Sequence, residues 1–335
     1  MTDAAVTLRD VYEARRAIQS IAIRTPLVPS SPLEERTGVR CHLKLENVQR
    51  SGAFKIRGSA NKLRRLRQEQ RARGVITVSS GNHGRAVALV AQELGIRAVV
   101  CMSTRVPSNK VASIRRLGAE IVLHGDSYDE AERRAIDLQD HQGLTMIPPF
   151  DDPLIIAGQG TIGVELLEDL PELDTVLVPL SGGGLISGIA LVLKAADPSI
   201  RTVGVSMERA PVMVHSLRAG EPIEMEEEPT LADALAGGIG LSNRYTFRMV
   251  QTYVDETLLV TEAEIAAAMA FALEHHHLVV EGGGAVALAA LLADKVGVLG
   301  KHVGVVLSGG NVALSQLLEV AGRAMHDRVG NETDQ

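Results

Sequence analysis

Short apolar runs and longer amphipathic segments alternate along almost the whole chain. The short runs are rich in β-branched residues, which is typical of buried strands, and the longer ones space apolar residues at helical intervals. This alternation predicts an α/β protein built on parallel sheets that helices cover on both faces. We expect strands at Cys41–Leu45, Val75–Val78, Ala98–Met102, Glu120–Leu123, Thr175–Val178, Thr202–Val205 and Val303–Leu307. We expect helices at Leu8–Ser20, Ala86–Leu94, Val111–Leu117, Tyr128–Gln139, Leu185–Ala195, Glu262–Glu274 and Ala285–Ala293.

The composition excludes several classes of protein. With 335 residues, 45% hydrophobic and 22% charged, the chain can bury one large core or two. A net charge of −7 and the absence of a basic run with interleaved aromatics argue against a nucleic-acid partner. Cys41 and Cys101 are far apart, which makes a disulfide framework or a cysteine metal site implausible. The polar N-terminus and the lack of a membrane-spanning run lead us to expect a cytoplasmic protein with no membrane partner.

The octamer Ser51-Gly52-Ala53-Phe54-Lys55-Ile56-Arg57-Gly58 places a lysine between two large apolar residues. Burial beside apolar groups lowers the pKa of an amine and frees its lone pair for nucleophilic or Schiff-base chemistry. Taken alone, Lys55 is better explained by a helix whose lysine reaches solvent along its alkyl stem. The glycine-rich turns further along the chain favour the chemical interpretation.

Two of these turns follow predicted strands and present groups that bind anions. Ser79-Ser80-Gly81-Asn82-His83-Gly84 offers hydroxyl, amide and backbone N–H groups to a carboxylate or a phenolic oxygen. Ser181 to Gly188 contains three consecutive glycines that open a helix, an arrangement suited to a phosphate. It has neither the P-loop nor the dinucleotide spacing. Helix capping and close packing are the structural alternatives.

Two further motifs complete a possible cofactor site. Glu281-Gly282-Gly283-Gly284-Ala285 opens an apolar helix, and Ser308-Gly309-Gly310-Asn311 follows the last predicted strand. The hydroxyl of Ser308 can face a ring nitrogen, although it can equally cap a helix. One reactive lysine, a phosphate site without a lysine or metal, and a hydroxyl near a ring together describe pyridoxal 5′-phosphate.

In this order, the motifs closely resemble those of the threonine dehydratase and serine racemase group of pyridoxal-phosphate enzymes. These enzymes have the tryptophan-synthase-β-like fold, also called fold type II. The resemblance extends from Arg24-Thr25-Pro26-Leu27 and Lys44-Leu45-Glu46 to the Ser308 motif. It implies two parallel-sheet-based α/β domains with the active site between them. The larger would comprise residues 1–70 and 151–335, and the smaller, mobile one residues 71–150. A homodimer is the expected assembly.

The resemblance also implies roles for individual residues. Lys55 would form the internal aldimine with pyridoxal phosphate and act as the catalytic base, and Ser80 is where the racemases keep a second acid/base. The cofactor would be bound by Phe54, Lys55, Asn82, Gly182, Gly183, Gly184, Leu185, Glu281 and Ser308. The substrate carboxylate would lie against Ser79, Ser80, Gly81, Asn82 and His83.

Several positions depart from the pattern of the group. Ala53 stands where serine is usual, Ser181 replaces the first glycine of the phosphate loop, and Arg85 replaces a glutamine. Glu208 matches one cation ligand of the racemases, but Val214 stands where an acidic partner is expected, so we predict no metal site. The consecutive histidines 275–277 cannot converge on a metal if they lie on a helix. We also expect no regulatory domain after the last glycine motif.

The activity that the resemblance implies is elimination of water, then ammonia, from a hydroxy amino acid such as threonine or serine. Val178–Gly184, Ser206–Arg209 and Gly237–Leu241 look like the hydroxyectoine-utilisation dehydratase branch, which suggests a hydroxyectoine-derived substrate. A catabolic threonine ammonia-lyase, an amino-acid racemase, a β-replacement synthase and a non-catalytic pyridoxal-phosphate carrier remain as alternatives.

Overall fold

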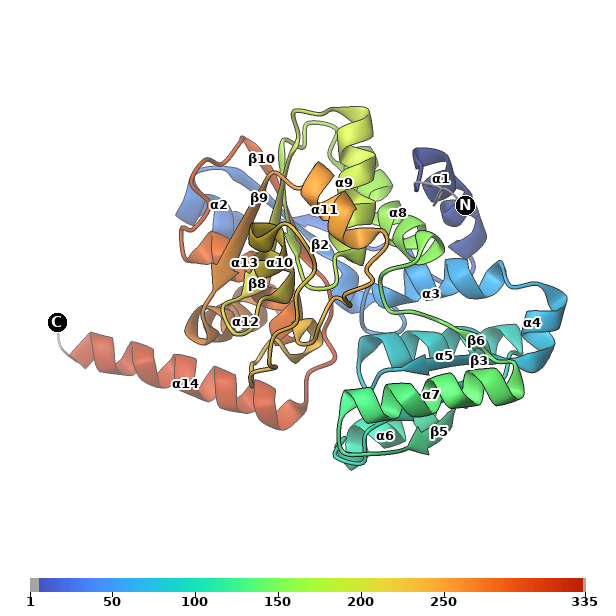
Figure 1. Ribbon diagram of the computed structural model, residues 1–335. Helices are drawn as coiled ribbons and strands as arrows, with labels where there is room; N and C mark the ends of the chain where they lie inside the picture. Colours follow the sequence, from blue (N-terminus) through green and yellow to red (C-terminus); the bar gives the residue numbers. More distant parts are fainter. Residues whose placement is uncertain (1–5, 334–335) are drawn as a thin grey trace.

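Two mainly parallel sheets form the frame of the molecule, as Figure 1 shows. The computed structural model describes residues 6–333, with side chains described as far as residue 323. The larger sheet has the order β1-β2-β10-β7-β8-β9 and the smaller one the order β5-β4-β3-β6. All neighbouring strands are parallel except β1 and β2, so the predicted α/β class is confirmed. The strands are β1 (Leu27–Pro29), β2 (Arg40–Leu45), β3 (Val75–Val78), β4 (Ala98–Met102), β5 (Glu120–Leu123), β6 (Thr145–Met146), β7 (Thr175–Pro179), β8 (Arg201–Met207), β9 (Glu256–Val260) and β10 (His302–Leu307).

Helices lie on both faces of the sheets, and every helix predicted from the apolar spacing is present. None of the described helices has the length and apolar character needed to cross a membrane. The helices are α1 (Leu8–Ile18), α2 (Ser31–Thr37), α3 (Lys55–Arg64), α4 (Gln68–Arg73), α5 (Asn82–Leu94), α6 (Ser108–Arg115), α7 (Tyr128–Gln142), α8 (Pro153–Asp169), α9 (Gly184–Ala196), α10 (Val212–Ala219), α11 (Thr246–Tyr253), α12 (Glu262–His276), α13 (Gly282–Leu292) and α14 (Leu314–Thr333). Short 3₁₀ turns are η1 (Glu46–Val48) and η2 (Asp233–Leu235).

The glycine-rich motifs begin helices instead of preceding them. We predicted helix starts at Ala86 and Ala285, but α5 begins at Asn82 and α13 at Gly282. Residues interpreted as turn are therefore the first helical turn, where three or four backbone N–H groups lack an intrahelical acceptor. The motifs thus present N–H groups in a fixed direction, which a flexible turn would not do.

Several elements escaped the sequence analysis, chiefly β9 and α8. Helix α8 is buried continuously from Ile155 to Leu166, so its residues show no polar face to mark a helix. It packs against α9, α3 and α1, and Figure 1 shows it between α9 and α1. By contrast, the acidic run Glu224–Glu228 lies outside helices and strands and is largely exposed.

One apolar core joins the smaller sheet to α3. Ile56, Ala60 and Leu63 of α3 pack in the same cluster as Val75 of β3 and Val100 of β4. Helix α3 therefore has apolar contacts with the smaller sheet, although it precedes the expected domain boundary at residue 70. A small mobile domain of residues 71–150 remains a prediction.

Candidate active site

The lysine octamer and the Ser308 motif lie side by side at the carboxyl end of β10. The Phe54 N–H donates to the Ser308 carbonyl at 3.0 Å, and the Gly310 N–H donates to the Gly52 carbonyl at 2.9 Å. Ala53 and Gly309 form an antiparallel bridge between these bonds. The first residues of α3 are thereby fixed against the edge of the larger sheet where ligands bind in such folds.

Lys55 is the first residue of α3, and its amine donates to a backbone carbonyl. Its Nζ donates to the Pro149 carbonyl at 2.8 Å and lies 5.1 Å from the centroid of the Phe54 ring. Burial lowers the pKa of Lys55 to about 8. An appreciable fraction of the amine is therefore neutral near neutral pH, as nucleophilic chemistry requires.

Asn82, Glu281 and Asn311 join three of the predicted motifs in one buried network. The Asn82 Nδ2 donates to Glu281 Oε1 at 2.5 Å, and the Asn311 Nδ2 donates to Asn82 Oδ1 at 2.7 Å. The Asn311 backbone N–H donates to Glu281 Oε2 at 3.1 Å. Burial raises the pKa of Glu281 to about 7, although the Asn82 hydrogen bond opposes this shift. Asn311 was quoted in its motif but not predicted as a site residue.

The N-terminus of α5 offers free backbone N–H groups beside Lys55. Gly81 precedes the helix without a side-chain cap, and the first intrahelical bond of the helix runs from the Arg85 N–H to the Gly81 carbonyl. The N–H groups of residues 82–84 therefore remain available to an anion, as expected for a substrate carboxylate. Ser79 accepts from the Gly81 N–H at 3.2 Å, and Ser80, partly exposed, has no side-chain hydrogen bond to the described residues.

The ring of His83 is bonded to the backbone, which leaves the His83 backbone N–H for the predicted substrate carboxylate. Its Nε2 donates to the Ile147 carbonyl at 2.9 Å, and only 3% of the residue is exposed. Burial, helped by the charge of Lys55, lowers the pKa of His83 to about 3, so the ring is neutral. His83 can therefore contact a carboxylate through its backbone N–H, while its ring holds the loop after β6 in place.

The predicted phosphate loop, residues 182–185, opens α9 and requires glycine for two separate reasons. Gly183 has φ of 82°, a left-handed conformation that strains other residues. A Cβ added at Gly182 would lie 2.3 Å from a carbon of the Phe150 ring. No side chain caps α9, so its first N–H groups and its positive end are available to a phosphate. Phe150 follows the carbonyl that binds Lys55, which connects the loop to the lysine.

Ser308 completes a donor set that fits pyridoxal phosphate. The residue is 4% exposed, and its hydroxyl has no hydrogen-bond partner among the described residues, as a group reserved for a ligand would. The buried amine of Lys55, the uncapped helix α9 and this hydroxyl supply the three contacts that the cofactor needs. The residues of the site therefore fit the group that the sequence predicted.

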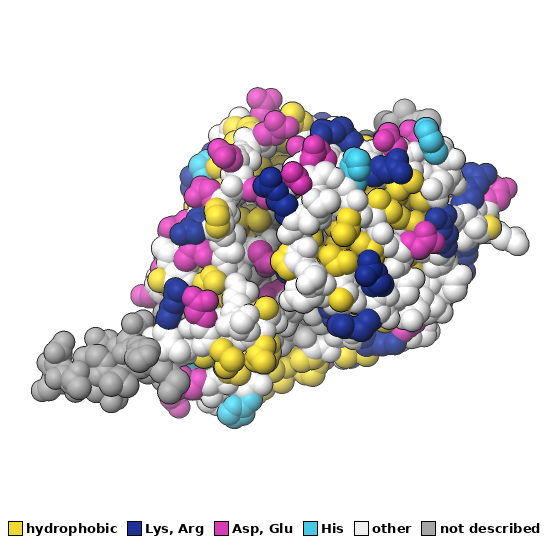
Figure 2. Space-filling model, turned by 90° about the horizontal axis from the view of Figure 1, so that it is seen from below, with side chains coloured by type: hydrophobic (Ala, Val, Ile, Leu, Met, Phe, Trp, Pro, Cys, Tyr) yellow, Lys and Arg dark blue, Asp and Glu magenta, His cyan; other side chains and the backbone are white. Residues whose placement is uncertain are grey.

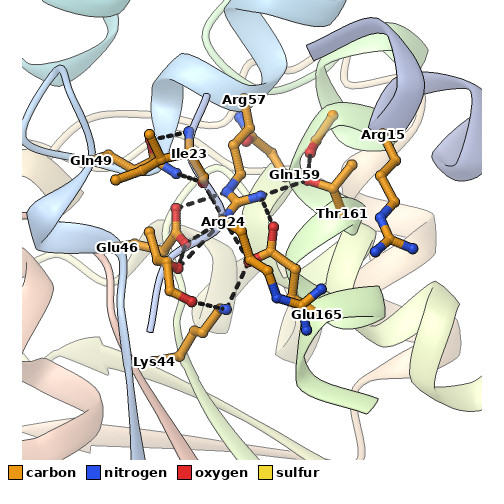
Figure 3. A network of polar contacts seen from close by, with 12 residues as sticks. Arg15, Ile23, Arg24, Lys44, Glu46, Gln49, Arg57, Gln159, Thr161 and Glu165 are labelled. Atoms are coloured by element: carbon orange, nitrogen blue, oxygen red, sulfur yellow. Dashed lines mark hydrogen bonds and ion pairs between the residues drawn. The ribbon is translucent and has the colours of Figure 1, made fainter. Parts of the chain in front are cut away.

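A buried cluster of four charges, absent from the prediction, anchors α3 behind Lys55 (Figure 3). Arg57 contacts Glu46 through bonds of 2.8 and 2.9 Å and Glu165 through bonds of 2.6 and 2.8 Å. The Lys44 Nζ lies 2.7 Å from Glu165 Oε2. All four residues are at most 5% exposed. Lys44, Glu46, Arg57 and Glu165, which we call the charge quartet, tie α3 to β2 and α8.

The residues considered for metal binding have other partners. His276 bonds to the Ser30 hydroxyl at 2.9 Å, whereas the His275 ring stacks on Phe271 at 4.4 Å. Glu208 lies 3.8 Å from the Lys295 ammonium. No group of three His, Cys, Asp or Glu side chains suited to a metal occurs among the described residues.

Comparisons with known proteins identify the family of this chain. The family model for "Pyridoxal-phosphate dependent enzyme" matches residues 18–309. The chain is 44% identical over 320 residues to L-threonine ammonia-lyase of Thermotoga maritima, covering 96% of this chain and 79% of the relative. The structure of maize serine racemase superposes with a TM-score of 0.89 at 35% identity, covering 98% of this chain and 100% of that one. The structure of a threonine deaminase from tomato, Solanum lycopersicum, gives a TM-score of 0.86 at 34% identity, with 96% of each chain covered. The chain therefore belongs to the pyridoxal-phosphate-dependent enzymes of fold type II, among relatives of the threonine dehydratase and serine racemase kind.

Proposed function

We propose that this protein is a lyase that removes water and then ammonia from a β-hydroxy amino acid. The observation that carries the proposal is the position of the Lys55 amine, whose pKa is lowered to about 8. It bonds to the Pro149 carbonyl next to Phe150, which packs against the α9 phosphate loop, and its charge acts on His83 at the start of α5. The relatives named for threonine ammonia-lyase and threonine deaminase activity support the same reaction. The product would be a keto acid together with free ammonia.

The side chains divide the work of this reaction. Lys55, the α9 loop and Ser308 would hold pyridoxal phosphate, which would supply the sink for the electrons released at the substrate Cα. The N–H groups of residues 82–84 hold the substrate carboxylate and fix its orientation. The Lys55 amine, set free when the substrate amine takes its place on the cofactor, would then take the Cα proton, because burial has lowered its pKa to about 8. Departure of the hydroxyl from the next carbon follows, and hydrolysis releases ammonia.

Racemisation is a second candidate, and it depends on Ser80. This residue is part-exposed at the start of the α5 motif, with its hydroxyl free of described partners. A hydroxyl on the face opposite Lys55 can return a proton to the Cα and invert it. Exchange of L- and D-serine, followed together with ammonia release, separates the two activities. Inversion faster than ammonia release would contradict the lyase proposal.

For the substrate, we propose a hydroxyectoine-derived hydroxy amino acid that is larger and more polar than threonine. The support comes from the branch motifs and from the three departures at the cofactor turns. Ala53 is fully buried, and the Ser181 hydroxyl donates to the Leu235 carbonyl at 2.8 Å. Of the three departures, Arg85 alone keeps its polar group free for a substrate.

Competition between threonine and a hydroxyectoine-derived amino acid tests this substrate class. We expect slow but measurable dehydration of threonine and a kcat/KM at least roughly tenfold higher for the hydroxyectoine-derived compound, because specificity depends on differential binding in the transition state. Ammonia and keto acid would be quantified with both substrates present. A preference for threonine would contradict the branch assignment and leave the lyase proposal standing.

We also propose that the protein is a homodimer that uses the outer face of α14. Leu314 and Leu318 are 70% and 62% exposed and lie one turn apart, whereas Leu317 and Val320 face the core. Figure 1 shows α14 running beyond the body of the molecule, and Figure 2 shows hydrophobic side chains along the lower edge of the view from below. Sedimentation equilibrium should give twice the monomer mass for the wild type and a lower mass for L314S/L318S. A monomeric wild-type protein would contradict the proposal.

A further inference from the structure

Arg85 is a part-buried guanidinium without an acceptor. Its Nε is buried, and no hydrogen bond or ion pair joins its side chain to any described residue. Burial and the charge of Arg116 lower the pKa of Arg85, and Glu281 offsets this only in part. In contrast, the fully buried Arg57 is bonded to two carboxylates. An arginine has five donors, and burying them unpaired is costly unless a ligand receives them.

The position of Arg85 directs it toward the substrate end of the site. It follows Asn82 by three residues on α5, so the two share one face of the helix. Helical side chains lean toward the N-terminus, which here is the end with the free N–H groups of residues 82–84. Glu281, the charged partner of Asn82, lies near enough to affect the pKa of Arg85.

Glu281 is not the missing partner of Arg85. Its Oε1 accepts from Asn82 and its Oε2 accepts from the Asn311 N–H, and no hydrogen bond or ion pair joins either oxygen to Arg85. Burial raises its pKa to about 7, which means that it carries only part of a negative charge near neutral pH. Arg116 is exposed on the neighbouring helix end and repels Arg85. The charge near the start of α5 is thus predominantly positive.

We propose that Arg85 selects substrates carrying a second anionic group, a carboxylate, beyond the hydroxyl-bearing carbon. This inference rests on the proposed lyase function and narrows its substrate class. The α5 N–H groups take the α-carboxylate, and the planar guanidinium suits bidentate binding of the second one. A side chain ending in an ammonium is excluded by the same charge. Among hydroxyectoine-derived compounds, those with an acidic side chain therefore fit best.

Two substrates that differ in one group test the inference. threo-3-Hydroxy-L-aspartate carries a carboxylate where L-threonine carries a methyl group, and both have the hydroxyl that elimination requires. Hydroxyaspartate loses water, regains it on hydrolysis and releases one ammonia, leaving oxaloacetate. We expect kcat/KM for hydroxyaspartate to exceed that for threonine at least roughly tenfold, since a hydrogen bond to a charged group contributes that much.

Variants at position 85 separate charge recognition from structural damage. In R85Q the ratio of the two kcat/KM values should fall at least roughly tenfold, mainly through the KM for hydroxyaspartate. R85K keeps the positive charge but loses the planar guanidinium that can bind both oxygens of a carboxylate. It should therefore retain part of the preference for hydroxyaspartate over threonine. R116Q removes an exposed charge next to Arg85 and serves as the matched control, with the ratio preserved.

Binding of unreactive analogues gives a readout without turnover. L-Aspartate and L-2-aminobutyrate differ in the same carboxylate and methyl groups but lack the hydroxyl, so neither can be dehydrated. Their Kd values, measured by calorimetry, should differ at least roughly tenfold in favour of aspartate and converge in R85Q. If neither hydroxy amino acid is dehydrated, the proposed function fails. If threonine is dehydrated but the kcat/KM ratio and the Kd values are the same in R85Q as in the wild type, only the role of Arg85 fails.

Discussion

K55A should lose both the visible absorbance of the lysine-bound cofactor and the turnover. Lys55 is the first residue of α3. Its amine donates to the Pro149 carbonyl, and burial lowers its pKa to about 8. Loss of a positioned general base alone typically lowers the rate by about 10²- to 10⁴-fold, and loss of the covalent link adds to this. Absorbance spectra and ammonia release on the same preparation measure both effects.

Lys62 provides the control on the same helix. Its Nζ is paired with Asp152 at 2.6 Å, on the side of α3 that faces the start of α8. K62A therefore removes a lysine from α3 without touching the proposed cofactor contacts, and its spectrum should resemble that of the wild type. An unchanged spectrum and rate in K55A would show that another group binds the cofactor.

R57M should destabilise the protein by about 3–5 kcal/mol, the range typical of breaking a buried ion pair from one side. The variant leaves Glu46 and Glu165 buried without the guanidinium that binds both of them. Urea unfolding, followed by circular dichroism, gives the change in the free energy of unfolding. The double variant E46Q/R57M restores charge balance in the charge quartet and should recover part of the loss.

A surface pair and the pH dependence give two checks on that result. Arg97 and Glu120 form an exposed ion pair, so R97M should cost less than about 1 kcal/mol. Burial alone would raise the pKa of Glu165, but Arg57 and Lys44 hold it below its ordinary value of 4.5. The contribution of Glu165 is therefore complete above pH 4.5 and lost as the pH falls through its lower folded pKa. A loss in R57M as small as in R97M would contradict the stabilising role of the charge quartet.

The motifs of the chain were sufficient to predict the fold class and the cofactor. A β-branched run followed by glycines and small polar residues has few structural solutions, because parallel strands place such segments at one edge of the sheet. Lys55, the 182–185 loop and Ser308 could therefore be proposed as cofactor contacts before any contact was known. The helix starts at Asn82 and Gly282 were placed too late, since glycine at a first helical turn cannot be told from a loop by local preference.

Contacts between distant segments account for what the sequence did not predict. Helix α8 has no polar face to reveal it, because other helices surround it, and Glu165 within it looks like an ordinary surface residue. Asn311 and Glu281 are 30 residues apart in the sequence, and their hydrogen bond forms only once β10 has taken its place in the larger sheet.

Sequence alone determined which chemical groups this protein has and in what order they follow the strands. The tertiary structure decided which of these groups are already paired. Arg57 and Arg85 are the same residue type, yet one is enclosed by two carboxylates and the other has no described partner. The physical reason is that desolvation and pairing depend on neighbours brought together from distant parts of the chain, and local pattern carries no information about them.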